Sequence, residues 1–383
     1  MRAYKLPSIL VAMAVLAAPS LWAQASNPVP PPTKAQAVAK VAPARARSLP
    51  EFEVDKAWPK VPAKWKLGDA SSIAIDSQDN VWLLHRPRTL VKPTDAGMAA
   101  PPVMVFDASG NFVKAWGGED AGPQWPQREH GIHVDTKGFV WITGNNCPTN
   151  GVPGLRRVDD DQILKLTGDG KVAMRIGQSD ESKGNADTRN VHRAADVWVH
   201  AATNELYVAD GYGNRRIIVF DAETGAFKRM WGAFGNKPID DDHCEVVTRT
   251  SFLAGPGPQS FSIVHAVRVA KDGMVYVADR ENRRVQAFTP NGTFMKQIVK
   301  TDTPFARNLA LSADPVQEFL YVGNGQEIAI VDRHSLESIG SVKVPGMIGG
   351  GHLIATDSKG NLYIAGTAAG LQKLTFKGTS VPK

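Results

Sequence analysis

The chain has 383 residues, of which 43% are hydrophobic, and it contains 35 glycines and 26 prolines. This composition is too apolar for a wholly disordered chain and is typical of a large, turn-rich β protein. The formal net charge of +6 comes from lysines and arginines scattered along the chain. The sequence therefore shows no basic stripe of the kind that binds nucleic acid.

The first 25 residues have the pattern of a secretory signal peptide. Arg2 and Lys5 precede an apolar run over 6–21, and the small-x-small triplet AQA ends at Ala25. The alternative is a membrane anchor, but the run is short, contains two prolines, and no other segment is long enough to span a bilayer. We expect cleavage after Ala25 and a secreted or periplasmic protein.

A change of composition separates a linker from the folded part. Residues 26–50 are rich in Pro, Ala and Lys without apolar periodicity, so we expect a flexible or extended linker. Residues 51–61 (EFEVDKAWPKV) instead resemble a strand of a later repeat at 111–117 (NFVKAWG). We predict that they form the outer strand of the last sheet in a ring, because such a ring closes when both chain ends share one sheet. The predicted domains are a signal peptide (1–25), a linker (26–50) and one β domain (51–383).

A four-strand repeat dominates that domain. Residues 264–298 contain short alternating apolar segments separated by the turn sequences KDG and PNG, which is the pattern of a four-stranded antiparallel unit, and residues 195–231 repeat it. Its strand-turn-strand portion recurs at 71–83, 130–142, 196–208, 265–277, 308–322 and 352–364. The predicted fold is all-β, a six-bladed β-propeller.

Long insertions interrupt the repeats at 87–102, 145–161, 179–194 and 235–260. Each follows the second strand of a blade or connects two blades, so all are expected on one face of the ring. This shared side favours a walled pocket over insertions tolerated at random. Cys147 and Cys244, the two cysteines of the chain, fall in two of these insertions, so a disulfide bond between them is plausible in an oxidising compartment.

The first position of each repeat is polar, and it holds Ser71, His130, Asp196, His265, Asn308 and His352. The histidines occupy alternate blades, so their side chains should meet at the mouth of the central channel. A single histidine at a strand start is usually only hydrogen-bonded, but three in this arrangement match a metal site with an open position. We predict zinc, with Ni, Cu, Co or Fe left open by the ligands alone. The off-register histidines, which we give no ligand role, are His85, His133, His192, His200, His243 and His334.

A second set of polar residues follows the second strand. Blade one has Arg86 there, blade four has Arg280, and blade three has Tyr212. Two guanidiniums beside a metal suit a substrate that carries a carboxylate, and a tyrosine can act as a general base. The structural alternatives are that Arg280 pairs with Asp279 or Glu281, and that Tyr212 is a turn residue.

The repeats resemble NHL repeats, and residues 65–376 are similar to peptidyl-α-hydroxyglycine α-amidating lyase, the lyase domain of peptidylglycine amidating enzymes. The matching segments are LLHRP (83–87), HGIHVDTKGFVWIT (130–143), VADGYGNRR (208–216), VHAVRVAKDGMVYVADRENRRVQAF (264–288) and HLIATDSKGNLYIAG (352–366). The resemblance implies that His130, His265 and His352 bind zinc. It also implies that Tyr212 acts near the substrate hydroxyl and that Arg86 and Arg280 serve the active site.

The chain departs from this family at two positions. The family has an aspartate that binds calcium after its third zinc histidine, but the chain has Leu353, so we expect no calcium there. The family's cysteine beside the tyrosine is Gly213 in this chain.

The resemblance implies a metal-dependent lyase that cleaves the C–N bond of a carbinolamide, such as an α-hydroxyglycine, to an amide and glyoxylate. The substrate would be a small molecule or peptide with a carboxylate. We expect a monomer that binds no nucleic acid and does not span a membrane. One alternative is a non-enzymatic NHL propeller that binds a peptide, sugar or cell-envelope partner through its loop face. Another is a lactonase-like calcium hydrolase, but the first-strand register lacks the Glu/Asn/Asp ligand set of that class.

Overall fold

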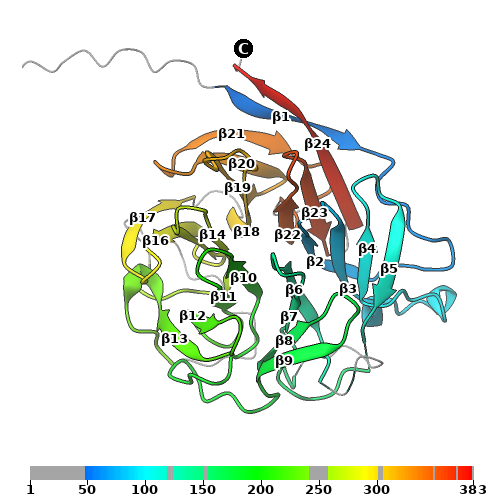
Figure 1. The fold of residues 1–383 in the computed structure, drawn as a ribbon, viewed down its shortest axis with the longest axis horizontal. Helices are drawn as coiled ribbons and strands as arrows, with labels where there is room; N and C mark the ends of the chain where they lie inside the picture. Colours follow the sequence, from blue (N-terminus) through cyan, green and yellow to red (C-terminus); the bar gives the residue numbers. More distant parts are fainter. Residues whose placement is uncertain are drawn as a thin grey trace, which may run out of the picture. The chain divides into compact units, whose positions relative to one another are not determined.

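In the part of the chain that it describes, the computed structural model has 24 strands in six four-stranded antiparallel sheets. Figure 1 shows these sheets around a central axis. The structure describes residues 48–381 apart from 119–121, 123, 150–153, 241–257, 301–304, 348–349 and 368–369. The predicted signal peptide and almost all of the predicted linker lie outside the described residues. The six-bladed β-propeller predicted from the repeats is confirmed.

Five blades are formed by consecutive strands. Blade one contains β2 (Asp69–Ile75), β3 (Val81–Arg86), β4 (Val103–Phe106) and β5 (Phe112–Trp116). Blade two contains β6 (Glu129–Val134), β7 (Val140–Gly144), β8 (Gln162–Leu166) and β9 (Val172–Gly177). Blade three contains β10 (Asp196–His200), β11 (Glu205–Asp210), β12 (Arg216–Asp221) and β13 (Phe227–Trp231). Blade four contains β14 (Val264–Val269), β15 (Val275–Asp279), β16 (Arg284–Phe288) and β17 (Phe294–Val299). Blade five contains β18 (Phe305–Leu311), β19 (Phe319–Asn324), β20 (Glu327–Asp332) and β21 (Ser338–Lys343).

The sixth blade combines strands from both ends of the described chain. It contains β22 (Leu353–Thr356), β23 (Leu362–Gly366) and β24 (Gly370–Ser380), and β1 (Leu49–Asp55) pairs antiparallel with β24 as its outer strand. Figure 1 shows these two strands, coloured blue and red, side by side. The predicted closure is therefore confirmed. The strand expected over 51–61 ends earlier, because the Asp55 carboxylate accepts the N–H of Ala57 at 3.0 Å and prolines follow at 59 and 62.

The strands form where apolar and polar residues alternate in the sequence. How deeply a strand is buried depends on its place in the blade. The first strands of neighbouring blades contact one another around the axis. The two middle strands of blade two, β7 and β8, are buried along their whole length, whereas three of the six residues of the outer strand β9 are exposed. Apolar side chains of adjacent blades interlock between the sheets, such as Tyr207 of β11 with Val267 of β14 and Val277 of β15. Each such buried side chain stabilises the fold by about 1.5–3 kcal/mol.

A buried ion pair supports the connection after the second strand in two blades. Arg216 Nε donates to Asp210 at 2.8 Å in blade three, and Arg284 Nε donates to Asp279 at 2.7 Å in blade four. All four side chains are fully buried. Removing one partner of such a pair typically costs 3–5 kcal/mol, so these pairs fix the turns that carry Tyr212 and Arg280.

The long connections share one end of the blades, as predicted. Residues 87–102 and 145–161 join second to third strands, while 178–195 and 232–263 join one blade to the next. Within 232–263, residues 241–257 lie outside the described part of the chain, and Cys244 is among them. Cys147 is not a free thiol, and its predicted bridge to Cys244 stays a prediction.

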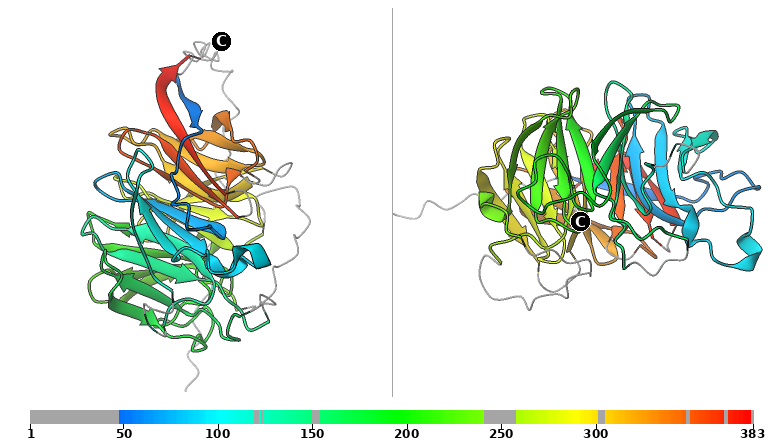
Figure 2. Two further views of the ribbon diagram at one scale, coloured as in Figure 1. Left: turned by 90° about the vertical axis from the view of Figure 1, so that its right-hand side faces the viewer. Right: turned by 90° about the horizontal axis from the view of Figure 1, so that it is seen from below.

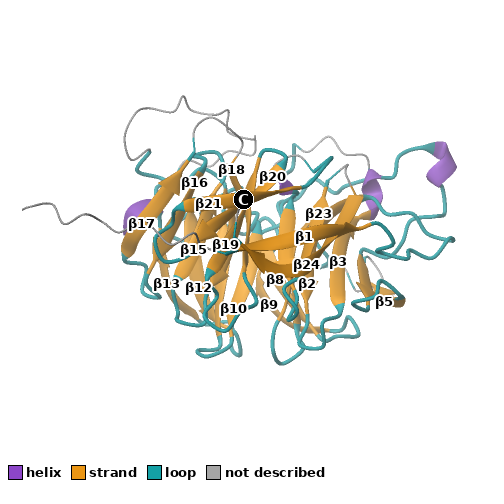
Figure 3. Ribbon diagram, turned by 90° about the horizontal axis from the view of Figure 1, so that it is seen from above, coloured by secondary structure: helices purple, strands orange, loops and turns teal. Residues whose placement is uncertain are grey.

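Helical structure among the described residues is limited to short 3-10 turns such as Pro87–Thr89 and Pro93–Asp95, which Figure 3 shows in purple among the orange strands. The side views in Figure 2 show the blades as stacked sheets with loops at both ends. No helix in the described ranges has the length and hydrophobicity needed to cross a bilayer.

A candidate metal centre at the mouth of the channel

Irregularities at the start of the first strands determine where two of the three histidine side chains point. The pairing register of β6 shifts between Glu129 and Ile132, around His130, and that of β14 shifts between Val264 and Ala266, around His265. Such bulges turn a side chain away from the regular alternation. The third histidine, His352, immediately precedes β22, and its N–H donates to Ala365 O at 2.6 Å.

The three imidazoles converge on one point. Their ring centroids are 4.7, 4.9 and 5.0 Å apart, and one ligand nitrogen from each lies within 4.8 Å of the others. All three side chains are buried. Zinc binds imidazole nitrogens at about 2.0–2.1 Å, so small movements of these rings would bring all three nitrogens onto one ion. The three histidines, which the sequence places in alternate blades, therefore do lie together in the structure.

Backbone carbonyls of the neighbouring blades orient all three rings. Nδ1 of His130 lies 2.7 Å from Ala195 O, Nδ1 of His265 lies 2.6 Å from Arg307 O, and Nδ1 of His352 lies 2.5 Å from Ser71 O. A carbonyl oxygen only accepts, so each Nδ1 must carry the proton. This tautomer leaves the Nε2 lone pair for a metal, and such carbonyl partners are typical of metal-binding histidines.

The electrostatics keep these imidazoles neutral. The pKa of each is held well below its usual value, and burial is the largest cause in all three. Arg280 contributes next at His265, and Arg86 contributes next at His352. Metal binding requires the unprotonated imidazole, so the site fits a cation chemically as well as geometrically.

Tyr212 reaches the same point from the turn after β11. Its hydroxyl lies 3.0 Å from Nε2 of His130 and 3.2 Å from Nε2 of His265. Gly211 makes this approach possible, because a Cβ there would lie 2.1 Å from the carbonyl oxygen of Val264. The tyrosine is thus both a turn residue and part of the centre.

Arg280 contacts Tyr212 directly. Its Nη1 donates to the tyrosine hydroxyl at 3.0 Å, and the guanidinium lies 5.4 Å from the centre of the tyrosine ring. Its Nε also pairs with Glu281 at 2.8 Å, which was the structural alternative from the sequence. Asp279 pairs with Arg284 instead. Arg280 is therefore held by a carboxylate while it places positive charge on the phenol oxygen.

Arg86 lies near the centre but is held differently. Its Nε donates to the backbone carbonyl of Glu129 at 2.7 Å, and its side chain is buried. Burial, followed by the charge of Arg128, lowers the pKa of Arg86 to about 10. A substrate carboxylate beside this guanidinium would favour its charged form.

The sequence analysis missed two arginines. Burial lowers the pKa of the three histidines most, and two arginines add to it: Arg128 lowers the pKa of His130, and Arg307 lowers that of His265 and His352. Arg307 directly precedes Asn308, the polar position of blade five, and Arg128 stands two residues before His130. A search of the residues flanking each first-strand position would have found both.

No protein-family model matches this chain, but curated relatives do. It is 27% identical over 289 residues to peptidyl-glycine alpha-amidating monooxygenase A of Xenopus laevis, which covers 72% of this chain and 27% of that protein. It is 26% identical over 244 residues to NHL repeat-containing protein 3 of Mus musculus, covering 62% of this chain and 57% of that protein. It is 27% identical over 162 residues to the probable peptidyl-alpha-hydroxyglycine alpha-amidating lyase pgal-1 of Caenorhabditis elegans, and the match covers 42% of this chain and 36% of that protein.

These relatives confirm the resemblance drawn from the motifs: the chain is a distant homologue of amidating enzymes and NHL-repeat proteins. It matches only about a quarter of the length of the Xenopus protein. Among solved structures, a streptogramin B lyase superposes with a TM-score of 0.52 at 13% identity, covering 85% of this chain and 98% of that chain. That likeness supports the propeller fold alone.

Proposed function

We propose that this protein is a zinc-dependent lyase that cleaves the C–N bond of a carbinolamide of the α-hydroxyglycine type. The supporting observation is the convergence of three buried, neutral imidazoles on the Tyr212 hydroxyl, with Arg280 donating to that hydroxyl. The relationship to proteins named as amidating enzymes supports the same reaction class. The residues present fit zinc, and an ion held there would supply a Lewis acid to the substrate oxygen.

The residues of the chain divide the reaction between them. Tyr212 takes the proton from the substrate hydroxyl. The electron pair of that O–H bond forms a C=O bond, the C–N bond breaks, and its electron pair goes to the nitrogen, which takes up the proton that Tyr212 accepted. The products are an amide and an aldehyde acid such as glyoxylate. Arg280 stabilises negative charge on the tyrosine oxygen through its hydrogen bond of 3.0 Å.

Positive charge gives the site its substrate preference. Arg86 and Arg280 flank the centre from blades one and four, and both are largely buried. Arginine binds a carboxylate through paired hydrogen bonds and is hard to deprotonate. The substrate carboxylate is therefore placed against these guanidiniums, with the hydroxyl toward Tyr212. We further propose that the protein acts outside the cytoplasm, after cleavage behind Ala25.

The direct test is release of glyoxylate from α-hydroxyhippurate, whose cleavage also yields benzamide. The purified zinc-loaded protein should release both products in equal amounts, and the chelator-treated protein should release neither above the uncatalysed rate. Zinc binding without any turnover would contradict the lyase and favour a non-enzymatic propeller, like the NHL-repeat alternative. Turnover that survives complete metal removal would contradict the role of zinc.

A further inference from the structure

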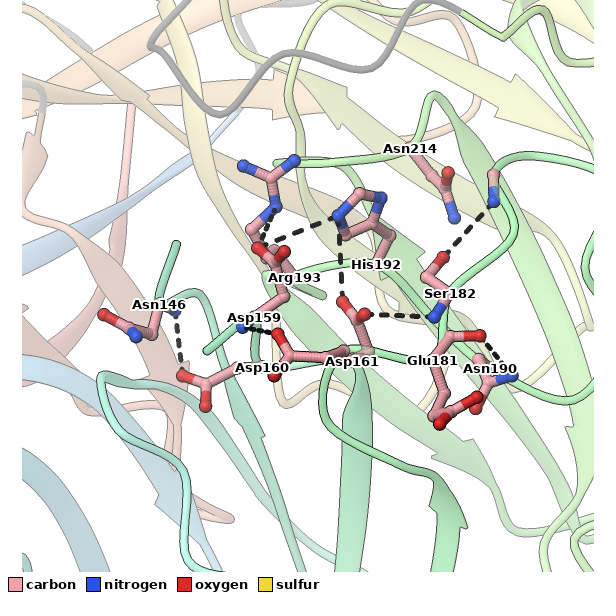
Figure 4. Close-up of polar contacts among 12 residues, drawn as sticks. Asn146, Asp159, Asp160, Asp161, Glu181, Ser182, Asn190, His192, Arg193 and Asn214 are labelled. Carbon is pink, nitrogen blue, oxygen red and sulfur yellow. Dashed lines mark hydrogen bonds and ion pairs between the residues drawn. The ribbon is translucent and has the colours of Figure 1, made fainter. Parts of the chain in front are cut away.

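A second group of metal-ligand side chains lies behind the turn that carries Tyr212. Asp159 and Asp161 belong to the long connection of blade two, and His192 belongs to the connection between blades two and three. One ligand atom from each residue lies within 4.8 Å of the others. Figure 4 shows the two carboxylates facing the imidazole. The sequence analysis gave His192 no such role, although the Asp-x-Asp spacing at 159–161 was visible.

The distances within this group are too long for hydrogen bonds. His192 Nε2 lies 3.8 Å from Asp159 Oδ1 and 3.8 Å from Asp161 Oδ1. A proton on Nε2 would bring one carboxylate oxygen to about 2.7–2.9 Å, as charged hydrogen bonds are short. Two ligand atoms that each lie about 2.1 Å from one zinc ion can be up to about 4.2 Å apart. The spacing therefore suits a shared cation better than a shared proton.

A buried carboxylate oxygen supplies an independent sign of a missing ligand. Asp161 is only 2% exposed, its Oδ2 accepts the N–H of Ser182 at 3.1 Å, and its Oδ1 has no hydrogen-bond partner among the described residues. That oxygen is directed at His192 (Figure 4). A buried carboxylate oxygen without a partner is costly, and a bound cation would remove that cost.

The neighbouring carboxylate shows what a purely structural aspartate looks like here. Asp160 accepts the N–H groups of Gln127, Arg128 and Asn146 at 2.8–3.0 Å, so both of its oxygens are satisfied. Asp159 and Asp161 flank Asp160 in the sequence. The Oδ1 atom of each lies on the side of His192 and has no hydrogen-bond partner among the described residues. Asp160 therefore holds the backbone of the loops, whereas Asp159 and Asp161 each keep one oxygen available to a cation.

The donor atoms also indicate which cation the group would bind. Arg193 Nε lies 3.4 Å from Asp159 Oδ1, at the edge of the group. One nitrogen and two carboxylate oxygens are suited to zinc or a similar divalent transition metal, since calcium and magnesium prefer oxygen ligands alone.

The group is connected to the candidate active site through the backbone. Tyr212 N–H donates to Arg193 O at 3.3 Å, and Gly213 N–H donates to His192 O at 3.0 Å. A Cβ at Gly213 would lie 2.4 Å from Cγ of His192, so only glycine fits against this ring. We propose that Asp159, Asp161 and His192 form a second, structural site for a divalent transition-metal ion, which fixes the turn that carries Tyr212.

The test counts zinc ions in the full chain after chelator treatment and dialysis against Zn²⁺. The wild type should bind two ions, and His265→Ala, which disables the three-histidine centre, should keep one. Adding Asp161→Asn or His192→Gln to His265→Ala should remove that remaining ion. Glu181→Gln in the same background is the control, because it removes an exposed carboxylate of the same connection and should leave the ion bound.

Two results would overturn the second site. One is a His265→Ala protein that binds no zinc, and the other is a double variant with Asp161→Asn that still binds the remaining ion. Asp161→Asn alone serves as the folding control, since its intact three-histidine centre should still bind one ion. If the three-histidine centre itself binds no zinc, the wild type and His265→Ala would both hold one ion that Asp161→Asn removes, so the two proposals fail separately.

Discussion

The even-numbered and odd-numbered blades contribute differently to the centre of the propeller. Blades two, four and six supply the imidazoles of His130, His265 and His352, while blades three, five and one supply the carbonyl groups that accept from their Nδ1 atoms. A ring of six similar sheets thus becomes a threefold site. The odd blades are not spacers, because they determine which nitrogen of each histidine faces the channel.

The odd blades also hold the even blades from the other side. Ser72 Oγ accepts the N–H of Ile132 at 3.1 Å. Asp196 accepts the N–H of Val267 at 3.3 Å. Asn308 Nδ2 donates to the carbonyls of Gly350 and Gly351, both at 3.1 Å, just before His352. Each histidine strand is therefore fixed by the blade before it and the blade after it. The lesson is that the odd blades position the histidine strands although they supply none of the three imidazoles.

The largest effect is expected from removing an even-blade ligand. His265→Ala should weaken zinc binding at the centre by more than about 100-fold and abolish glyoxylate release, because two imidazoles cannot replace three. Isothermal titration with Zn²⁺ and the product assay measure the two effects. Zinc affinity at the centre equal to that of the wild type would show that the even blades do not form the ligand set.

Tyr212→Phe should separate chemistry from metal binding. The variant should lose about 10²–10⁴-fold in kcat, the range expected for a general base, while its zinc content stays unchanged. Metal analysis and steady-state kinetics on the same preparation check both parts. Full activity in the variant would exclude the tyrosine as the base and leave the threefold centre without its assigned proton acceptor.

Asn308→Ala tests whether an odd blade positions a ligand of its neighbour. It removes the two hydrogen bonds to Gly350 and Gly351, so the zinc affinity should fall about tenfold, as is usual for groups that orient a ligand. The matched control is Ser71→Ala, at the same position of another odd blade, because Ser71 Oγ donates within its own blade to Leu84 O. Equal zinc affinities for Asn308→Ala and Ser71→Ala would show that Asn308 does not position the strand of His352.

The smallest effect concerns the pH dependence of stability in an odd blade. His85 is fully buried, accepts the N–H of Gly68 through Nδ1, and lies 3.0 Å from Pro101 O through Nε2, which fixes a neutral ring. Burial lowers the pKa of His85 from 6.5 to about 4. Since the folded state binds this proton less well than the unfolded state, the stabilisation is complete above pH 6.5 and is lost as the pH falls toward 4.

The size of this effect is at most about 1.4 kcal/mol per pH unit. Denaturant unfolding at several pH values should show a steeper acid loss for the metal-free wild type than for His85→Gln. Parallel curves for the two proteins would mean that His85 does not stay neutral in the folded state.

The sequence was sufficient to predict the ring and the convergence of three histidines. Tight turns fixed the strand register, and that register showed His130, His265 and His352 at one position of alternate blades. The carbonyl partners could not be predicted, because they belong to the backbone and depend on bulges at the strand starts.

The Asp159, Asp161 and His192 group escaped prediction for another reason. Its members lie in two irregular connections with no periodicity, and only the folded loops bring them together. Likewise, the end of β1 at Asp55 depends on a local hydrogen bond to Ala57 that no repeat pattern encodes.

A crystal structure of the zinc-loaded protein with anomalous data at the zinc edge examines the threefold centre most directly. We predict an anomalous peak on the channel axis, about 2.0–2.1 Å from Nε2 of His130, His265 and His352, with each Nδ1 still bonded to its carbonyl. A structure in which these three nitrogens share no ion, while zinc is bound elsewhere or not at all, would contradict the proposal.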